Sequence, residues 1–299
     1  MNINSFVFPF LKYNYQFGKK TWFGSGGNCR FFLKVNSLRQ LKTTLKIGKR
    51  VLPIFILGSG SNILVRDGGF KGIVIKLGSD FKKIEFDNKE NILSIGSAAK
   101  DLDVSRFCLE NNITGFEFLS GIPGTIGGNL KMNAGCFGYQ ISDQLLDCTI
   151  IDRNLETKKI AKQNINFDYR KSSFTNEDVI INAKFIVKRS NKETIKKKIH
   201  EISKLRKKSQ PVSTRTGGST FTNPPSQSAW KLIDSVKFRG KRIGGARVSN
   251  LHSNFLINDN HATSMDIELL GEEIRQSVWN KFKINLNWEL MRIGEFKKI

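Results

Sequence analysis

The sequence predicts an α+β fold, in which short strands form sheets and a few helices separate them. Three observations lead to this prediction. The chain has 299 residues, of which 39% are hydrophobic and 10% aromatic, enough to fill packed cores. Short apolar runs bounded by turn residues recur at the spacing of strands. Three longer segments have the apolar period of helices.

The first third of the chain is predicted to be rich in strands. Its apolar runs are Phe31–Val35, Pro53–Leu57, Ile63–Val65, Gly72–Leu77 and Ile92–Ile95. Turn-forming residues separate these runs, and such residues mark places where the chain changes direction. We therefore expect a sheet before the first helix.

The first predicted helix covers residues 101–112. Its apolar residues recur near the helical period, Asp101 is the expected N-cap, and an Asn pair stands at its end. After a glycine-dense tract, strands are expected again at Leu146–Asp152 and Ile180–Val187.

Two further helices are predicted in the last third. The first covers Glu193–Lys208 and ends before Pro211, because proline cannot continue a helix. The second covers Ser264–Phe282, with Ser264 as its expected N-cap. The sequence between them begins rich in turn residues, so we expect a domain boundary close to Pro211.

The charge of the chain is strongly positive. Lys and Arg total 49 against 26 Asp and Glu, a formal charge of +23. Such a balance favours nucleic acid, an anionic membrane surface or a polyphosphate ligand as a partner. Residues 192–208 alone carry eight Lys or Arg against two Glu. Lysine drift on exposed surfaces explains the same excess without any function, because such substitutions cost little stability.

The sequence predicts no membrane span, no secretory signal and no zinc site. No stretch approaches the roughly 20 consecutive apolar residues of a membrane span. The run Phe6–Leu11 has no preceding basic residue and no small-residue cleavage site after it, so we expect no secretory signal and a cytoplasmic protein. The cysteines (Cys29, Cys108, Cys136 and Cys148) and three histidines have no zinc spacing, and buried thiols without metal are expected.

A glycine and serine loop lies between two apolar runs. It consists of Gly58, Ser59, Gly60, Ser61 and Asn62. The loop fits neither the G-x-G-x-x-G pattern of dinucleotide-binding folds nor the phosphate-binding loop of nucleotide hydrolases. Its backbone N–H groups are able to converge on one anion, such as a pyrophosphate. A tight turn without a ligand remains the alternative.

A second tract is rich in glycine and almost free of charge. Its candidate ligand-binding residues are Gly121, Pro123, Gly124, Thr125, Gly127, Gly128, Asn133, Ala134 and Gly135. A solvated loop of this composition is unusual, so we expect it to lie against a flat aromatic ligand, with Thr125 and Asn133 bonding the ligand's edge. Close packing of a helix on a strand is the alternative.

Together the two tracts resemble the FAD-binding signature of the UDP-N-acetylenolpyruvoylglucosamine reductase family of bacterial cell-wall synthesis. Further motifs are similar to that family in the same order along the chain. They are Asp168–Phe174, Gly217–Pro224, Ala229–Asp234, Gly240, Ile243–Ala246, Val248-Ser249, Asn254–Asn258, Leu286–Leu290 and Ile293-Gly294. The resemblance covers nearly the whole chain, from about Thr21 to Gly294.

The resemblance implies an FAD-binding fold of the PCMH type in two α+β subdomains, residues 1–78 and 79–209, and an α+β substrate-binding domain, residues 210–299. It implies non-covalent FAD, NADPH as hydride donor, and UDP-N-acetylglucosamine-enolpyruvate as the substrate that becomes UDP-N-acetylmuramate. The compact segment between Arg170 and Ser219 resembles the shorter, type II form of the family. We expect a monomer that binds neither nucleic acid nor membrane and needs no metal.

The resemblance also implies three catalytic residues, and their chemistry suits the reaction. Arg170 offers a permanently charged planar fork to the substrate carboxylate. Ser219 is the candidate proton donor to the α-carbon, and Glu289 is expected to polarise the carboxylate. Without the motifs, each residue has an alternative role that involves no catalysis. Arg170 would be a surface arginine, Ser219 a serine in a turn, and Glu289 a glutamate paired with a lysine.

Two rival functions remain open from the sequence. A nucleic-acid-binding protein would account for the charge, although neither an RNP-type strand nor a helix-turn-helix pattern is present. An oxidase of the wider PCMH group would keep the flavin and change the reaction. The colour of the purified protein and its use of oxygen without NADPH distinguish these rivals from the reductase.

Overall fold

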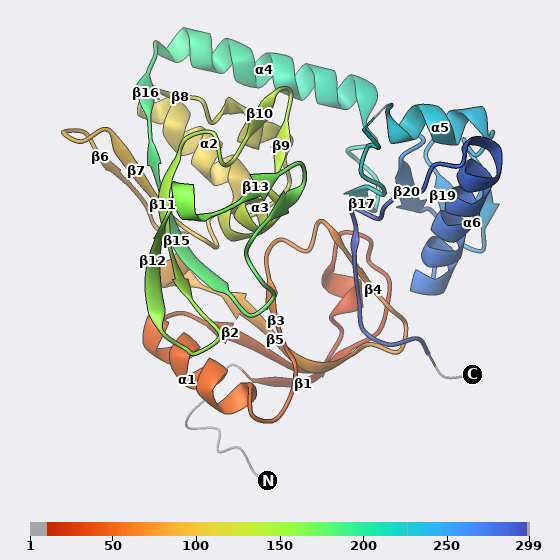
Figure 1. Cartoon of the computed structure of the whole chain (residues 1–299), viewed down its shortest axis with the longest axis horizontal. Coiled ribbons are helices and arrows are strands. Elements are labelled where there is room, and N and C mark those ends of the chain that lie inside the picture. Colours follow the sequence, from red (N-terminus) through yellow and green to blue (C-terminus); the bar gives the residue numbers. More distant parts are fainter. Residues whose placement is uncertain (1–10, 226, 298–299) are drawn as a thin grey trace. The chain divides into compact units, whose positions relative to one another are not determined.

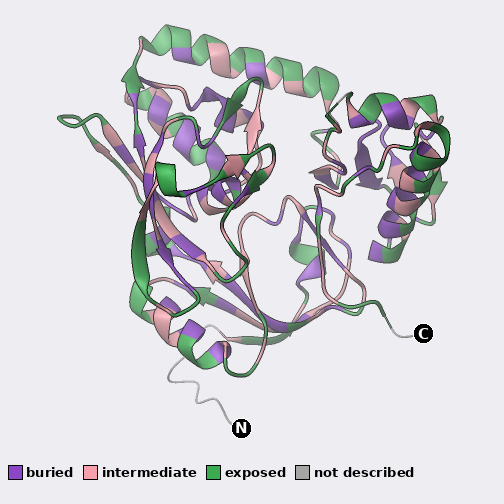
Figure 2. Ribbon diagram, viewed as in Figure 1, coloured by how far each residue is buried: buried purple, intermediate pink, exposed green. Residues whose placement is uncertain are grey.

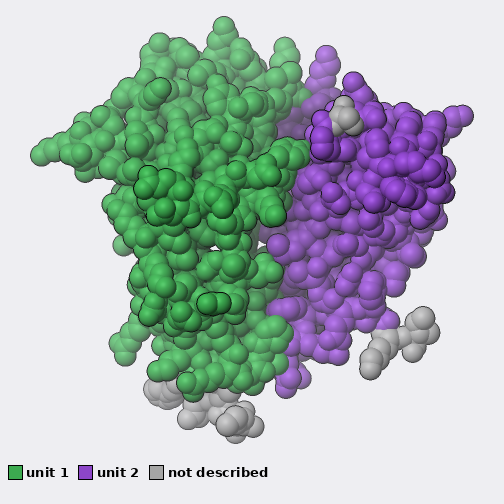
Figure 3. Space-filling model, in the orientation of Figure 1, with its two compact units in different colours: residues 1–11, 33–59, 73–205 green, residues 12–32, 60–72, 206–299 purple. Residues whose placement is uncertain are grey.

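The computed structural model describes residues 11–225 and 227–297. The apolar run Phe6–Leu11, for which we expect no secretory signal, therefore lies outside the described residues except for Leu11. The chain divides into two compact units (Figure 3). Unit 1 contains Leu33–Ser59 and Ile73–Leu205, and unit 2 contains Lys12–Phe32, Gly60–Gly72 and the segment from Arg206 onward. The expected boundaries at 78/79 and 209/210 stay predictions.

Unit 1 is built on a five-stranded antiparallel sheet (Figure 1). Its strand order is β12 (Thr157–Ala161), β11 (Leu145–Ile151), β15 (Val179–Ile186), β7 (Ile92–Gly96) and β6 (Ile84–Asp87). Helices α2 (Asp101–Glu110) and α3 (Ile126–Met132) share one hydrophobic core with this sheet, because apolar residues of both helices and of the central strands lie buried together. The core fixes α3, whose residues line the candidate site.

A second sheet has the order β1 (Lys12–Tyr15), β2 (Cys29–Val35), β5 (Phe70–Leu77) and β3 (Ile54–Leu57). Strand β3 is parallel to β5, and α1 (Leu38–Gly48) connects β2 to β3. The sequence analysis missed α1. Its N-cap is Ser37, whose side chain accepts from the N–H of Gln40, and it buries Leu41 and Leu45 one turn apart.

Short elements complete unit 1. The 3-10 helices are η2 (Ser79–Lys82), η3 (Glu117–Gly121) and η4 (Lys162–Asn164). The two-residue strands are β8 (Ile113–Thr114), β9 (Gly135–Cys136), β10 (Tyr139–Gln140), β13 (Phe167–Asp168), β14 (Lys171–Ser172) and β16 (Lys188–Arg189). Strands β13 and β14 form a hairpin.

Unit 2 contains a four-stranded antiparallel sheet and two helices. The strand order is β17 (Thr216–Ser219), β20 (Phe255–Asn258), β19 (Ala246–Val248) and β18 (Arg242–Ile243). The helices are α5 (Ala229–Ser235) and α6 (Ser264–Phe282), and a 3-10 turn, η1, covers Gly18–Lys20. Strand β4 (Ile63–Val65) pairs in parallel with β21 (Met291–Ile293).

Most predicted elements are confirmed. The five early strands correspond to β2, β3, β4, β5 and β7, and the later two to β11 and β15. The predicted helices are α2, α4 (Lys192–Ser209) and α6. Helix α4 buries few residues, chiefly Ile195 and Ile202 (Figure 2). Besides α1, the short helices α3 and α5 were missed. Among the described residues, no helix is both long and apolar enough to cross a membrane.

Both predicted N-caps were wrong by one residue. Helix α6 is capped by Thr263, whose Oγ1 accepts from the N–H of Asp266 at 3.0 Å, while Asp266 Oδ2 accepts from the N–H of Thr263. This reciprocal pair leaves Ser264 as the first helical residue. In α2 the cap position is Lys100, and the Asp101 carboxylate instead accepts from Asn129 Nδ2 at 2.7 Å.

The expectation of buried thiols is confirmed at three positions. Cys29, Cys108 and Cys148 are buried and free, whereas Cys136 is only half-buried, which corrects the prediction there. Burial raises the pKa of the Cys29 thiol to about 11 and that of Cys148 to about 12. These two thiols are therefore poor nucleophiles.

Candidate active site

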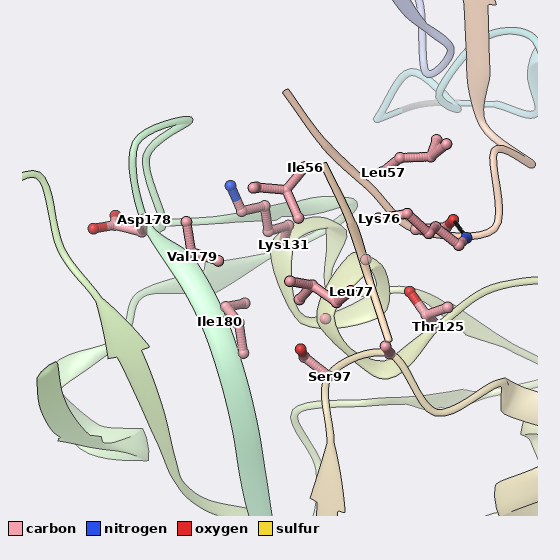
Figure 4. A pocket seen from close by; sticks show the side chains of 14 residues that line it. Ile56, Leu57, Lys76, Leu77, Ser97, Thr125, Lys131, Asp178, Val179 and Ile180 are labelled. Carbon is pink, nitrogen blue, oxygen red and sulfur yellow. Dashed lines mark hydrogen bonds between the residues drawn. The ribbon is translucent and has the colours of Figure 1, made fainter. Parts of the chain in front are cut away.

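Unit 1 contains a pocket that both glycine-rich tracts line (Figure 4). The first tract contributes Gly58, and the second contributes Thr125, Gly127 and Gly128. The other lining residues are Ile56, Leu57, Lys76, Leu77, Ser97, Ala98, Lys131, Asp178, Val179 and Ile180. Two segments that the sequence singled out independently thus meet at one pocket.

The first tract is tied to both units through its own ends. In unit 1, Ser59 Oγ donates to the carbonyl of Gly124 at 2.9 Å, and the Lys76 ammonium donates to the carbonyl of Gly58. In unit 2, the Gly60 carbonyl accepts from the N–H of Trp22 at 3.0 Å. Gly60 has a φ of 71°, a conformation that glycine adopts without strain.

Asn62, the last residue of this tract, is joined to the C-terminal part of unit 2. Its Nδ2 donates to the carbonyl of Glu289 at 3.1 Å, and its own carbonyl accepts from the N–H of Met291 at 3.1 Å. Ser61 beside it is half-buried. Asn62 therefore fixes the backbone of a predicted catalytic residue.

The second tract contains a helix where a loop was expected. Gly121 ends η3, Thr125 is the N-cap of α3, and Asn133 ends α3 in the left-handed region with a φ of 43°. Pro123 and Gly124 form the link before the helix, and Ala134 and Gly135 follow it. The first two N–H groups of α3 donate to the carbonyls of Ala99 and Ser97, at 3.2 and 2.8 Å.

The glycines of the tract have two different roles. A Cβ on Gly127 would lie 2.9 Å from the Cβ of Ser97, so this glycine allows close packing, as the alternative interpretation expected. A Cβ on Gly128 would meet only Thr125 Oγ1, at 3.5 Å, and one on Gly58 would meet the same atom at 2.9 Å. Gly128 thus keeps space open in the pocket, whereas Gly58, like Gly127, allows a close approach.

Buried polar atoms near the pocket fit a ligand with hydrogen-bonding groups. Ser97 Oγ and Asn133 Oδ1 are buried and have no hydrogen-bond partner among residues 11–225 and 227–297. Asn133 is otherwise well held, because its Nδ2 donates to Gln140 Oε1 at 2.9 Å and to the carbonyl of Asp168 at 3.1 Å. Unpaired buried atoms are rare in folded proteins, so a ligand partner is the simplest explanation.

Two half-buried lysines line the pocket, and neither was predicted from the sequence. Loss of hydration lowers the pKa of Lys76 to about 8, with a smaller effect of the positive Lys82 and Lys100. Loss of hydration also lowers the pKa of Lys131 to about 8, against a smaller opposing effect of Asp178. Both ammonium groups are partly removed from water, so an anion in the pocket would gain stronger interactions with them than at an exposed surface. For Lys76, the signal in the sequence was its position as the single lysine of the apolar run Gly72–Leu77.

Arg170 lies at the tip of the β13–β14 hairpin in unit 1. Its Nη2 donates to the carbonyl of Gly135 at 2.9 Å, and its guanidinium lies 5.1 Å from the ring centre of Tyr169. Its φ of 56° is uncommon for a residue with a side chain and costs backbone energy. The structure thus brings Arg170 to the end of the second glycine tract.

Ser219 and Glu289 lie on neighbouring segments of unit 2. Ser219 ends β17, and the N–H of Glu289 donates to the carbonyl of the next residue, Thr220, at 2.9 Å. Both residues are half-buried. A Cβ on Gly217 would lie 2.4 Å from the Phe23 ring, so only glycine allows this approach. The structure therefore brings together two of the three predicted catalytic residues, while the joint site of all three stays a prediction.

Comparison with known proteins gives a consistent result. A family model described as the C-terminal domain of UDP-N-acetylenolpyruvoylglucosamine reductase matches residues 210–293, and a model of an FAD binding domain matches residues 30–160. The reductase of Rickettsia prowazekii is 43% identical over 285 residues, which are 95% of this chain and 96% of the relative. That of Rickettsia conorii is 42% identical over 95% of both chains. The crystal structure of the Thermus caldophilus reductase covers 95% of this chain and 98% of its own, with 27% identity and a TM-score of 0.82.

Proposed function

Because the chain belongs to the UDP-N-acetylenolpyruvoylglucosamine reductase family of FAD-containing oxidoreductases, we propose that it uses NADPH to reduce UDP-N-acetylglucosamine-enolpyruvate to UDP-N-acetylmuramate. The structural observation that supports the proposal is the backbone pairing of Glu289 with Thr220, the residue after Ser219, because it sets the two predicted residues on neighbouring segments. The second half of this reduction needs a proton donor to the α-carbon and a carboxyl group that polarises the substrate carboxylate.

The residues present fit FAD. Gly128 leaves room in the pocket, Ser97 Oγ and Asn133 Oδ1 offer unused hydrogen-bonding capacity, and the ammonium groups of Lys76 and Lys131 suit a pyrophosphate. When bound, FAD supplies the hydride, taken from NADPH, that reaches the β-carbon of the enolpyruvyl group. In this proposal the other tract residues of unit 1 shape the same binding surface: Ser59, Gly121, Pro123, Gly124, Thr125, Gly127, Ala134 and Gly135. Gly60, Ser61 and Asn62, in unit 2, stay predicted FAD-binding residues.

Arg170 is proposed to hold the substrate carboxylate. Addition of hydride to the β-carbon places negative charge on the α-carbon and on this carboxylate. A guanidinium stays charged at every working pH and binds two oxygens at once. The hydrogen bond of Arg170 to Gly135 and its contact with Tyr169 hold the side chain in place before substrate arrives.

Ser219 is proposed to donate the proton that reaches the α-carbon. A serine hydroxyl is a weak acid, so it has to contact the carbon that carries the charge, and its own developing negative charge needs stabilisation. Gly218 before it has a φ of 84°, and a Cβ there would meet no atom within 4 Å, which leaves space for substrate. Glu289 is proposed to polarise the substrate carboxylate during this step.

Anaerobic titration of the purified protein tests the proposal. NADPH should bleach the flavin absorption band, and UDP-N-acetylglucosamine-enolpyruvate should then restore it. Colourless protein that binds no added FAD and retains nucleic acid on a filter at physiological salt would favour the nucleic-acid-binding rival. Oxygen consumption without NADPH would favour the oxidase. We further propose a cytoplasmic monomer, which sedimentation of the purified protein tests for its oligomeric state.

A further inference from the structure

The residue before Glu289 is Trp288, and its indole ring has contacts on several sides. Trp288 Nε1 donates to Glu272 Oε1 of α6 at 2.8 Å. Its ring lies 5.1 Å from the ring centre of Phe221 and 4.5 Å from the Arg292 guanidinium. A Cβ on Gly271 would lie 2.2 Å from the indole, so α6 comes as close to the ring as glycine permits.

Glu272 is itself fixed by two arginines. Arg292 Nη1 donates to Glu272 Oε1 at 3.0 Å, and Arg275 Nη1 donates to Glu272 Oε2 at 2.5 Å. Arg292 also bonds Glu268, one helical turn earlier, at 2.9 Å. Glu268 is only 6% exposed and accepts two further bonds from Arg66, at 3.0 and 2.8 Å. The indole partner is therefore part of a network with little freedom to move.

The backbone around Glu289 transmits the orientation of Trp288. The N–H of Glu289 donates to the carbonyl of Thr220, and the N–H of Thr222 donates to the carbonyl of Asn287, both at 2.9 Å. These bonds flank a bridge between Phe221 and Trp288. Successive side chains of a paired, extended segment point to opposite faces. With Trp288 directed at α6, Glu289 is directed away from α6.

We propose that Glu272 and Trp288 are positioning residues that orient Glu289 toward the substrate, through the hydrogen bond between the carboxylate and the indole N–H. This inference rests on the proposed function. Neither residue touches substrate in this proposal. The indole anchored on α6 holds the Cα of Trp288 and, with the bridge to Phe221, the backbone from which Glu289 extends. A small displacement of a reacting group is enough to slow a reaction by about 10²-fold.

Four variants separate positioning from mere stabilisation. Trp288→Phe removes the N–H and keeps an aromatic ring, and Glu272→Ala removes the acceptor. Glu272→Gln keeps an acceptor oxygen. Glu273→Gln is the matched control, because it removes the same charge from the neighbouring, exposed residue of α6. Each holoenzyme is studied by stopped flow for flavin reduction by NADPH and for flavin reoxidation by UDP-N-acetylglucosamine-enolpyruvate, together with kcat, KM and the midpoint of thermal unfolding.

The expected result is a selective loss. Trp288→Phe and Glu272→Ala should slow reoxidation by about 10- to 100-fold, while flavin reduction and KM stay within about twofold of wild type. Glu272→Gln should retain most of the reoxidation rate, and Glu273→Gln should match wild type. A large fall in thermal midpoint without a selective loss of reoxidation would show a structural role and overturn the proposal.

Other outcomes also decide the matter. Equal losses in both half-reactions, unchanged reoxidation in Trp288→Phe, or Glu272→Gln as slow as Glu272→Ala would each overturn the positioning role alone, provided that wild type completes both half-reactions. Wild-type protein that NADPH reduces but that the enolpyruvyl substrate does not reoxidise would overturn the proposed function and this inference with it.

Discussion

The pocket of unit 1 and the Glu289 segment of unit 2 are built in opposite ways. The pocket depends on residues without side chains, since Gly128 leaves it open and Gly58 lets Thr125 come close. The segment around Glu289 depends on side chains fixed by neighbours, as the bond from Trp288 to Glu272 illustrates. The difference teaches that a cofactor region needs space and backbone, whereas a region that moves protons needs polar groups in fixed orientations.

The two regions also treat charge differently. In the pocket, the charged neighbours that act on Lys76 are other lysines, and its pKa is lowered to about 8. In unit 2, Arg66 is paired with Glu268, and this hydrogen bond raises the pKa of Arg66. The positive charge of the pocket lysines is therefore available to an anionic ligand. In unit 2, the charges of Arg66 and Glu268 neutralise each other.

The largest expected effect comes from removing the proposed proton donor of unit 2, a change that leaves the pocket of unit 1 intact. Removal of a general acid costs about 10²- to 10⁴-fold in rate. Ser219→Ala should slow flavin reoxidation by the enolpyruvyl substrate by that factor, while NADPH still bleaches the flavin normally. Stopped-flow absorbance measures both steps. Unchanged rates in both steps would exclude Ser219 as the acid, and Ser213→Ala, an exposed serine of the same unit, is the control.

The next largest effect comes from filling the space in the pocket of unit 1 with a methyl group. Gly128→Ala places a methyl group where only Thr125 Oγ1 lies at ordinary contact distance, so the fold should tolerate it. FAD should bind more weakly by about 1–3 kcal/mol, a typical cost of overpacking. Fluorescence titration measures the affinity. Gly124→Ala is the contrast, because its Cβ would lie 2.5 Å from Asp101 Oδ2 and should destabilise the fold itself. Full FAD affinity in Gly128→Ala would place the cofactor elsewhere.

A third prediction concerns the buried charge of Lys76. Its pKa falls from 10.5 to about 8 on folding. Between these pH values the unfolded chain binds a proton that the folded chain has released, so the free energy of unfolding should rise as pH increases from about 8 to about 10. Lys76 should contribute about 1–3 kcal/mol of this gain, so the rise should be smaller by that amount in Lys76→Met and Lys76→Arg, where only the similar contribution of Lys131 remains. Urea unfolding of the flavin-free proteins at several pH values measures it. The same rise in Lys76→Met would assign it to another group.

The smallest effect concerns the cap of α6, the helix that carries Glu272. Thr263→Ala removes the side-chain oxygen that accepts from Asp266 and should lower the free energy of unfolding by about 0.5–2 kcal/mol. Thr263→Ser should restore most of it. Thermal and urea unfolding measure the loss, and a fully stable Thr263→Ala would mean that the bonds of Asp67 to the first N–H groups of α6 suffice.

The sequence predicted the strands and long helices well, because their apolar periodicity is strong. It missed α1 and α3 for different reasons. Helix α1 is mostly polar and is stabilised by its cap and a few buried leucines. Helix α3 has two glycines directly after its first residue, which disfavour helices in isolation, and its first N–H groups are satisfied by residues 97 and 99. Such tertiary contacts are invisible in a single sequence.

For the site, motifs in the correct order identified the glycine tracts and the candidates Arg170, Ser219 and Glu289. They did not identify Lys76, Lys131 or Glu272. These residues matter through burial or through a partner far away in sequence, and neither property shows in a local pattern. The wrong N-cap at Ser264 has the same origin, since Asp67 bonds its N–H from a segment 197 positions away.

The bond between Asn62 and Glu289 joins residues 227 positions apart, and β4 likewise pairs with the late strand β21. At about 5–20 residues per second, a ribosome needs roughly 10–45 s to make the intervening chain. During that interval β4 has an open edge, which invites pairing with other nascent chains. Biogenesis of this enzyme is thus expected to depend on chaperones that shield early segments until translation is complete.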